Sequence, residues 1–175
     1  MSDRAQEIDA AYAAAVAAAL TACGTAAPAN PVAIGATAPV YTARSLAGDS
    51  ASLSALRGKV VVLNIWATWC HPCRQEIPQL QALHATYADR GLTVVGVSID
   101  AAGTEAGIRE FVHEFAMTYP IWLDPDERVT SRFLTIGVPE TFVIDAKGVI
   151  RYQHIGEIRP EDVPLILEKL KEAQS

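Results

Sequence analysis

The chain has 175 residues, of which 50% are hydrophobic and 7% aromatic, and it carries a formal net charge of −6 with an isoelectric point near 5.1. This length and apolar content suffice for one domain with a sizeable core. The acidic balance, with no basic stripe and no interleaving of basic and aromatic residues, argues against nucleic acid as a partner.

The first 32 residues differ in composition from the rest and predict a leader followed by a tether. Ala10 to Leu20 is an 11-residue, alanine-rich run, too short to span a bilayer as a helix but typical of the apolar region of a signal peptide. Leu20-Thr21-Ala22-Cys23 is similar to a bacterial lipobox, and the Ala/Pro-rich stretch 25–31 indicates a linker. We therefore expect a leader and tether over residues 1–32 and a folded domain over residues 33–175.

The acidic start of the chain opposes this interpretation. Asp3, Glu7 and Asp9 outnumber Arg4, whereas a signal peptide begins with a positively charged region. Two alternatives stay open. The first Met could lie upstream of the true start, or residues 10–20 could be an alanine-rich helix in a protein that remains in the cytoplasm.

The remaining chain alternates apolar strands with amphipathic helices. Val60–Trp66 is nearly all apolar and rich in β-branched residues, which predicts a strand buried on both faces of a sheet, and Leu92–Asp100 has the same character. These patterns predict an α/β fold in which helices cover both faces of a mixed central sheet. Residues 38–46 are expected to form an early strand or hairpin, and the other expected strands are 60–66, 92–100, 121–124, 141–144 and 149–153. The expected helical segments are 53–56, 73–87, 104–115, 126–133 and 160–173.

Two cysteines mark the junction between the first buried strand and the helix that follows it. Cys70 is expected at the helix N-terminus, where unpaired N–H groups and a partial positive charge favour a thiolate, so we expect it to be the nucleophile. Cys73, one turn further in and less exposed, is placed to resolve the mixed disulfide. Pro72 suits the first turn of the helix, and a protonated His71 would also favour the thiolate.

Two other uses of a Cys-x-x-Cys pair must be weighed. A structural zinc site needs two further ligands, and the sequence has no second cysteine pair and no closely spaced histidine pair, so we expect no metal. A purely structural disulfide would close a very short loop and gain little chain entropy. A redox-active Cys70–Cys73 disulfide, with no other cofactor, is the better interpretation.

Two motifs together resemble a known family. Residues 66–78, WATWCHPCRQEIP, and residues 137–145, GVPETFVID, closely resemble the extracytoplasmic thioredoxin-like proteins of the TlpA/ResA/CcmG (DsbE) group, in the AhpC/TSA and redoxin superfamily. The resemblance covers about residues 33–173. It implies a thioredoxin-like fold, with an inserted strand and helix between about residues 92 and 123.

The resemblance also implies roles for particular residues. The Val138–Pro139 peptide bond should be cis and face the cysteines, and Trp69, Val138 and Pro139 should contact the substrate. Glu76 matches an acidic position that tunes the proton transfers of the dithiol. Its alternative interpretation is a solvated glutamate of the first helical turn.

One departure from ordinary thioredoxins concerns residue 64. Thioredoxins carry a buried aspartate six residues before the first cysteine, where this chain has Asn64. An amide can hydrogen-bond but cannot exchange a proton near neutral pH, so Glu76 is the candidate general acid and base.

The function implied is that of an extracytoplasmic thiol–disulfide oxidoreductase that reduces exported proteins such as apocytochrome c. Its partners would be protein disulfides and an upstream membrane electron donor, and the protein would be a monomer. If the resemblance extends to the leader, cleavage before Cys23 exposes this residue for lipid attachment on the periplasmic side of the membrane. An anchor would also account for the odd third cysteine.

Two alternatives share the fold. A peroxiredoxin-type thiol peroxidase needs a threonine three residues before its cysteine, where this chain has Ala67. Non-catalytic copper carriers on this fold are similar but have a Cys-x-x-x-Cys pair and a distal histidine, whereas Cys70 and Cys73 are separated by one residue fewer. The direction of electron flow cannot be read from the sequence, because reduction potentials on this fold vary widely with local electrostatics.

Overall fold

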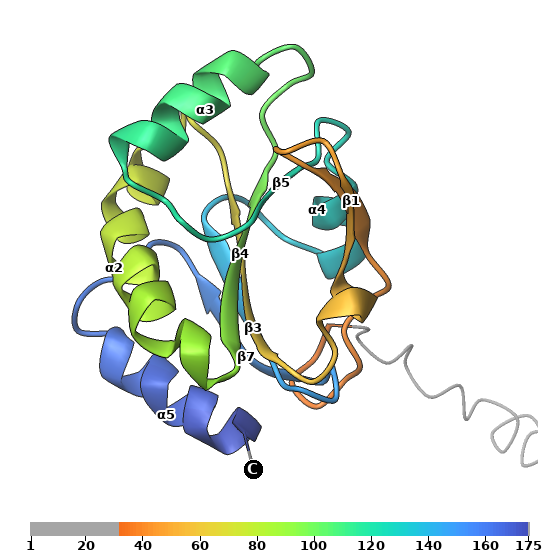
Figure 1. Ribbon diagram of the computed structural model, residues 1–175. Helices are drawn as coiled ribbons and strands as arrows, with labels where there is room; N and C mark the ends of the chain where they lie inside the picture. Colours follow the sequence, from red (N-terminus) through yellow and green to blue (C-terminus); the bar gives the residue numbers. More distant parts are fainter. Residues whose placement is uncertain (1–31, 175) are drawn as a thin grey trace, which may run out of the picture. The chain divides into compact units, whose positions relative to one another are not determined.

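A computed structural model describes residues 32–174. These residues form one seven-stranded mixed sheet with helices on both faces, as predicted (Figure 1). The leader, the tether up to residue 31 and Cys23 lie outside the described residues. No helix within residues 32–174 is long and apolar enough to cross a membrane.

The sheet has the strand order β2-β1-β5-β4-β3-β6-β7. Strands β3, β4 and β5 run parallel, and the pairs β1–β2, β1–β5, β3–β6 and β6–β7 are antiparallel. The two long apolar runs are therefore neighbours near the centre of the sheet, as their composition indicates. The strands are β1 (Thr42–Ser45), β2 (Ser50–Ser52), β3 (Val60–Trp66), β4 (Leu92–Ser98), β5 (Ile121–Leu123), β6 (Glu140–Ile144) and β7 (Ile150–Ile155).

The helices divide between the two faces of the sheet. Figure 1 shows α2, α3 and α5 on one face and α4 on the other. The predicted starts of the last two helices are early by two or three residues. The helices are α2 (His71–Tyr87), α3 (Glu105–Glu114), α4 (Arg128–Phe133) and α5 (Val163–Gln174), with short 3-10 helices at Leu53–Leu56 and Ala88–Arg90.

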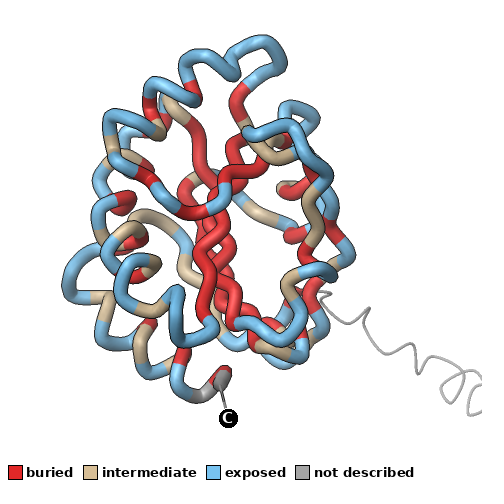
Figure 2. The backbone as a smooth tube through the Cα atoms, viewed as in Figure 1, coloured by how far each residue is buried: buried red, intermediate tan, exposed pale blue. Residues whose placement is uncertain are grey.

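Strand β3 separates two cores because its side chains alternate between the faces of the sheet. Val60, Val62 and Trp66 belong to the core that also holds α2, α3 and α5, whereas Val61 and Leu63 belong to the core beneath α4. Figure 2 shows this central strand region as continuously buried. Asn64 shares the face of Val62 and Trp66, so it points toward α2.

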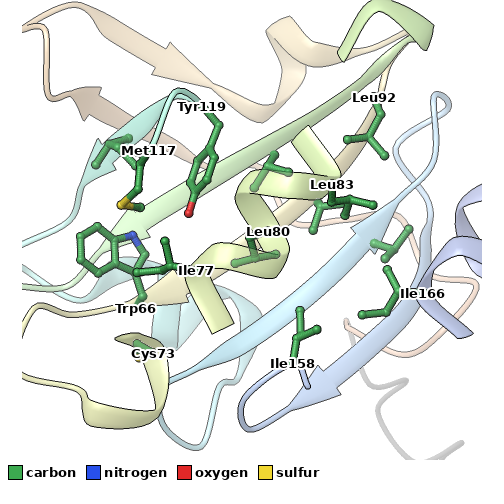
Figure 3. Close-up of a cluster of buried hydrophobic side chains, with 14 of the residues drawn as sticks. Trp66, Cys73, Ile77, Leu80, Leu83, Leu92, Met117, Tyr119, Ile158 and Ile166 are labelled. Carbon is green, nitrogen blue, oxygen red and sulfur yellow. The ribbon is translucent and has the colours of Figure 1, made fainter. Parts of the chain in front are cut away.

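A glycine on β4 makes room for two large rings in the α2 core. A Cβ at Gly96 would lie 2.8 Å from Trp66 Nε1, 3.1 Å from Ile121 Cδ1 and 3.2 Å from Tyr119 Cε2. Figure 3 shows Trp66 and Tyr119 packed beside Met117 and Ile77, with Cys73 at the border of the same cluster. Glycine at residue 96 therefore allows Trp66 and Tyr119 to pack closely against β4, behind the dithiol.

We expect Gly96→Ala to destabilise the protein by about 1–3 kcal/mol, because the added methyl group overpacks a dense core. Urea unfolding measures the change. Gly107→Ala on α3 is the matched control, since a Cβ there meets nothing within 4 Å. That change should be neutral or stabilise by up to about 1 kcal/mol. Equal effects of the two substitutions would contradict this account of residue 96.

Candidate active site

The two cysteines lie at the junction of β3 and α2, as the sequence predicts. A tight turn follows Trp66, in which the Cys70 amide donates to the Ala67 carbonyl over 3.2 Å, and Cys70 is the N-cap residue of α2. Cys70 and Cys73 form a disulfide, and Cys70 Sγ also accepts a hydrogen bond from the Cys73 amide over 3.2 Å. Cys70 is 4% exposed and Cys73 is fully buried, so a partner reaches the Cys70 sulfur first.

The position of Cys70 favours its thiolate. The first amides of a helix have no intrahelical acceptor and point toward the N-cap side chain, and here the Cys73 amide already donates to the Cys70 sulfur. The partial positive charge of the helix end adds to this stabilisation. His71 and Pro72 are both exposed in the first turn of α2.

Glu76 is fully buried on the face of α2 that carries Cys73, one helical turn away. Asn64 Nδ2 donates to its Oε1 over 2.6 Å, and the Ile158 amide donates to its Oε2 over 2.9 Å. Burial raises the pKa of Glu76 to about 8, against the opposing effect of these two hydrogen bonds, and the negative charge of Glu157 adds to the rise. The solvent-exposed alternative for Glu76 is therefore wrong, and its pKa lies near that of a free thiol.

Asn64 connects Glu76 to the strand that follows Pro139. Its Nδ2 donates both to Glu76 and, over 3.0 Å, to Thr141 Oγ1. The predicted hydrogen-bonding role of Asn64 is confirmed by these contacts. An amide suits a partner that gains and loses a proton, because its N–H donates to a carboxylate and its oxygen, after the amide turns over, accepts from a carboxylic acid.

The residues expected to contact a substrate lie around the dithiol. The Val138–Pro139 bond is cis, as expected, and Val138 packs against the cluster that contains both cysteines. Trp69 is 67% exposed and lines one groove together with Val138, whereas Pro139 is buried. The structure thus brings Trp69, Val138 and Pro139 to one region, and their contact with a substrate stays a prediction.

A carboxylate that the sequence analysis missed holds the turn before Cys70. Asp100 is buried and accepts from the Thr68 amide over 3.0 Å and from the Thr68 hydroxyl over 2.6 Å. Ser98 Oγ donates to it over 2.8 Å. Trp66 and Ser98 are paired at the ends of β3 and β4, so Thr68 and Asp100, which follow these strands, lie at the same edge of the sheet. Polar residues just after two neighbouring strands were the signal in the sequence that could have predicted this contact.

No metal centre accompanies the dithiol in the described part of the chain. Between residues 32 and 174, no group of three or more His, Cys, Asp and Glu side chains is arranged to hold a metal ion.

A dithiol at a helix N-terminus, beside a cis-proline loop on a mixed sheet, defines a thiol–disulfide oxidoreductase of thioredoxin-like fold. The chain belongs to the AhpC/TSA family, which it matches over residues 34–153. The thioredoxin-like protein YneN of Bacillus subtilis is 37% identical over 127 residues, 72% of this chain and 74% of the relative. The thiol–disulfide oxidoreductase ResA of Geobacillus kaustophilus is 34% identical over 140 residues, 80% of this chain and 79% of the relative.

Solved structures agree with this assignment. A protein of Chlorobium tepidum assigned as a thiol:disulfide interchange protein DsbE superposes with a TM-score of 0.75 at 30% identity, covering 81% of this chain and 98% of that one. StoA of Bacillus subtilis superposes with a TM-score of 0.60 at 25% identity, covering 71% of this chain and 92% of that one. The fold and the family expected from the two sequence motifs are confirmed.

We expect Glu76→Gln to change how stability depends on pH. Between about pH 4.5 and 8 the folded protein keeps the Glu76 proton that the unfolded chain loses. The folded state therefore binds more protons in this window, and the contribution of Glu76 to stability falls as pH rises, by up to about 1.4 kcal/mol per pH unit. The glutamine variant lacks this decline. Urea unfolding of both proteins at pH 5, 7 and 9 measures the difference, and parallel pH curves would show that Glu76 is not protonated in the fold.

We expect Asp100→Ala to slow thiol exchange at Cys70 several-fold, because the turn before the helix loses the acceptor of Thr68 and Ser98. Alkylation rates of the reduced protein measure this effect under conditions where it is fully folded. Asp145→Ala is the matched control: Asp145 is equally buried and holds the Val149 amide in the β6–β7 turn, at the opposite end of β3. A similar loss of rate in both variants would show a general effect of destabilisation.

Proposed function

We propose that this thiol–disulfide oxidoreductase acts outside the cytoplasm and reduces disulfides in exported proteins, with apocytochrome c as a substrate. The observation that carries the reductive mechanism is the buried Glu76 behind a dithiol at a helix N-terminus. The two sequence motifs shared with the TlpA/ResA/CcmG group support the compartment and the substrate class.

The proposed reaction proceeds in two exchanges. The Cys70 thiolate attacks one sulfur of the substrate disulfide, a Cys70–substrate bond forms, and the substrate S–S bond breaks to release a thiolate that takes up a proton. The Cys73 thiolate then attacks the Cys70 sulfur and frees the second substrate thiolate. Two electrons pass to the substrate, and the protein is left with the Cys70–Cys73 disulfide. A membrane dithiol donor would restore the reduced state by the reverse exchange.

Glu76 is proposed to handle the proton of Cys73. A group with a pKa of about 8 is present in both its protonated and its ionised form near neutral pH, so it can give and take a proton there. The ionised form, a minor fraction at neutral pH, accepts the Cys73 proton, and the carboxyl group is then neutral beside the Cys73 thiolate, so two negative charges do not meet in one buried site. Cys70, at the helix N-terminus, has its own stabilisation and does not need this carboxyl group.

The peroxidase alternative receives no support from the threonine nearest to the nucleophile. Thr68, two residues before Cys70, donates its hydroxyl hydrogen to Asp100 over 2.6 Å and is part of the turn. Residue 67, three positions before Cys70, is an alanine.

The leader is proposed to place the domain on the outer side of the membrane. In this proposal the tether ends at residue 32 and the folded domain begins at residue 33, with lipid attachment at Cys23. The apolar run, the lipobox-like tetrapeptide and the Ala/Pro-rich linker support the assignment. Such a tether would keep a monomeric domain near both its membrane donor and newly exported substrates.

We expect Cys73→Ser to trap a mixed disulfide between Cys70 and an oxidised peptide with the Cys-x-x-Cys-His sequence of an apocytochrome c, because the resolving thiol is gone. Peptide mass spectrometry identifies the linked cysteine. The wild-type protein, reduced beforehand, should release the reduced peptide, and Cys70→Ser should do neither.

The reduction potential decides the direction of electron flow. Equilibration of the Cys70–Cys73 couple with glutathione should give a value well below that of a strong oxidant such as DsbA, about −120 mV. A potential near that value would contradict the proposed reductase, whereas a mixed disulfide formed through Cys73 in Cys70→Ser would contradict the assignment of Cys70 as the nucleophile.

A further inference from the structure

A groove beside the dithiol has an apolar wall on each side. It has a volume of about 310 Å³ and runs between Trp69, which precedes Cys70, and the loop that leads into Pro139. Trp69 is 67% exposed and Ile136 82% exposed, although both are large apolar side chains. The lining includes Trp69, Ile99, Glu127, Ile136, Gly137 and Val138.

The reaction itself brings a substrate chain to this groove. A substrate sulfur must meet Cys70, so the residues on either side of the substrate cysteine pass over the neighbours of Cys70. Trp69 is one of these neighbours, and Val138, on the facing wall, packs against the cysteine-containing cluster. Large exposed apolar side chains beside a reacting centre are typical of surfaces that bind a partner.

The wall formed by α4 and the following loop is held in place. Asp124 Oδ2 accepts from the Val129 amide over 2.6 Å, and the buried Glu140 accepts from the Ile136 amide over 3.3 Å. Glu127 and Leu134, at the two ends of α4, have φ values of 52° and 51°, a left-handed conformation that is unfavourable for residues other than glycine. The backbone that carries Glu127 and Ile136 on this wall is therefore held by hydrogen bonds to buried carboxyl groups.

The rim of the groove is acidic. Glu127 is exposed and is the one charged residue among the described residues that line it, and the adjacent Arg128, also exposed, forms a 3.2 Å ion pair with the buried Asp124. A basic side chain on the substrate would complement the negative charge of Glu127, whereas an acidic one would be repelled.

We infer that this groove is a specificity site for the substrate polypeptide: an apolar side chain next to the substrate cysteine lies between Trp69 and Ile136, and a neighbouring Lys or Arg faces Glu127. The inference rests on the proposed function, since it assigns the substrate preference of the same dithiol. It makes Glu127 and Ile136 determinants of substrate choice that do not touch the reacting sulfurs.

The test compares two disulfide peptides that differ in one residue. Both carry a leucine beside one cysteine, and the residue next to this leucine is lysine in the first peptide (Leu-Lys) and glutamate in the second (Leu-Glu). The reduced wild-type protein should reduce the Leu-Lys peptide about three- to tenfold faster. Glu127→Lys should reverse this preference, because the charge at the rim is inverted. The ratio of the two rates within one variant is the readout, so a general change in dithiol reactivity cancels. Glu168→Lys, exposed on α5, changes the net charge equally and should keep the wild-type ratio.

A second pair of peptides, Leu-Lys and Gly-Lys, tests the apolar part. Ile136→Ser should reduce the preference for leucine several-fold, whereas Val40→Ser, equally exposed but outside this groove, should not. Wild-type rates that are equal for all peptides would overturn the specificity site while leaving the oxidoreductase intact. A failure to reduce any of them would instead count against the proposed function.

Discussion

The arrangement of this domain depends on keeping one carboxyl group, that of Glu76, away from water behind a dithiol. Burying a carboxyl group is costly unless it is neutral or well hydrogen-bonded, and here both conditions contribute. Its two oxygens are held by Asn64 from β3 and by the Ile158 amide from the loop after β7. Three different segments, β3, α2 and the loop after β7, therefore meet at one ionisable group.

This contact explains why the strand under the dithiol carries an amide. A carboxylate at residue 64, only 2.6 Å from Glu76, would place two acids in one buried site, and they could not both ionise. With Asn64, a single carboxyl group carries the proton, and the amide donates a hydrogen bond to it. The same amide contacts Thr141, two residues after Pro139, so the proton site and the cis-proline loop share one hydrogen-bond network.

Much of the fold and the centre of the site could be predicted from the sequence. Val60–Trp66 and Leu92–Ser98 are apolar throughout because they are buried on both faces, and that composition is local information. The cysteine pair, Pro139 and Glu76 belong to motifs that are contiguous in the chain. The burial of Glu76 could not be derived in this way, because its partners Asn64 and Ile158 are 12 and 82 residues away.

The parts that escaped prediction are made by contacts between loops. Asp100 holds Thr68 across 32 residues, and this contact exists only because β3 and β4 are parallel neighbours that end at the same edge. The groove depends likewise on the left-handed residues at both ends of α4, which a helical pattern over residues 126–133 does not reveal.

These loops and the dithiol perform separate tasks at one edge of the sheet. Sulfur chemistry needs a rigid, buried and proton-linked centre, which β3, α2 and Glu76 provide. Substrate choice needs an exposed surface that can vary without disturbing that centre, and Trp69, Ile136 and Glu127 lie on such a surface. Because Asp100 holds Thr68, the residue before Trp69, and Glu140 accepts from the Ile136 amide, the backbone of each wall is anchored by a buried carboxylate. The exposed side chains can therefore be substituted without removing the buried contacts that hold the turn before Cys70.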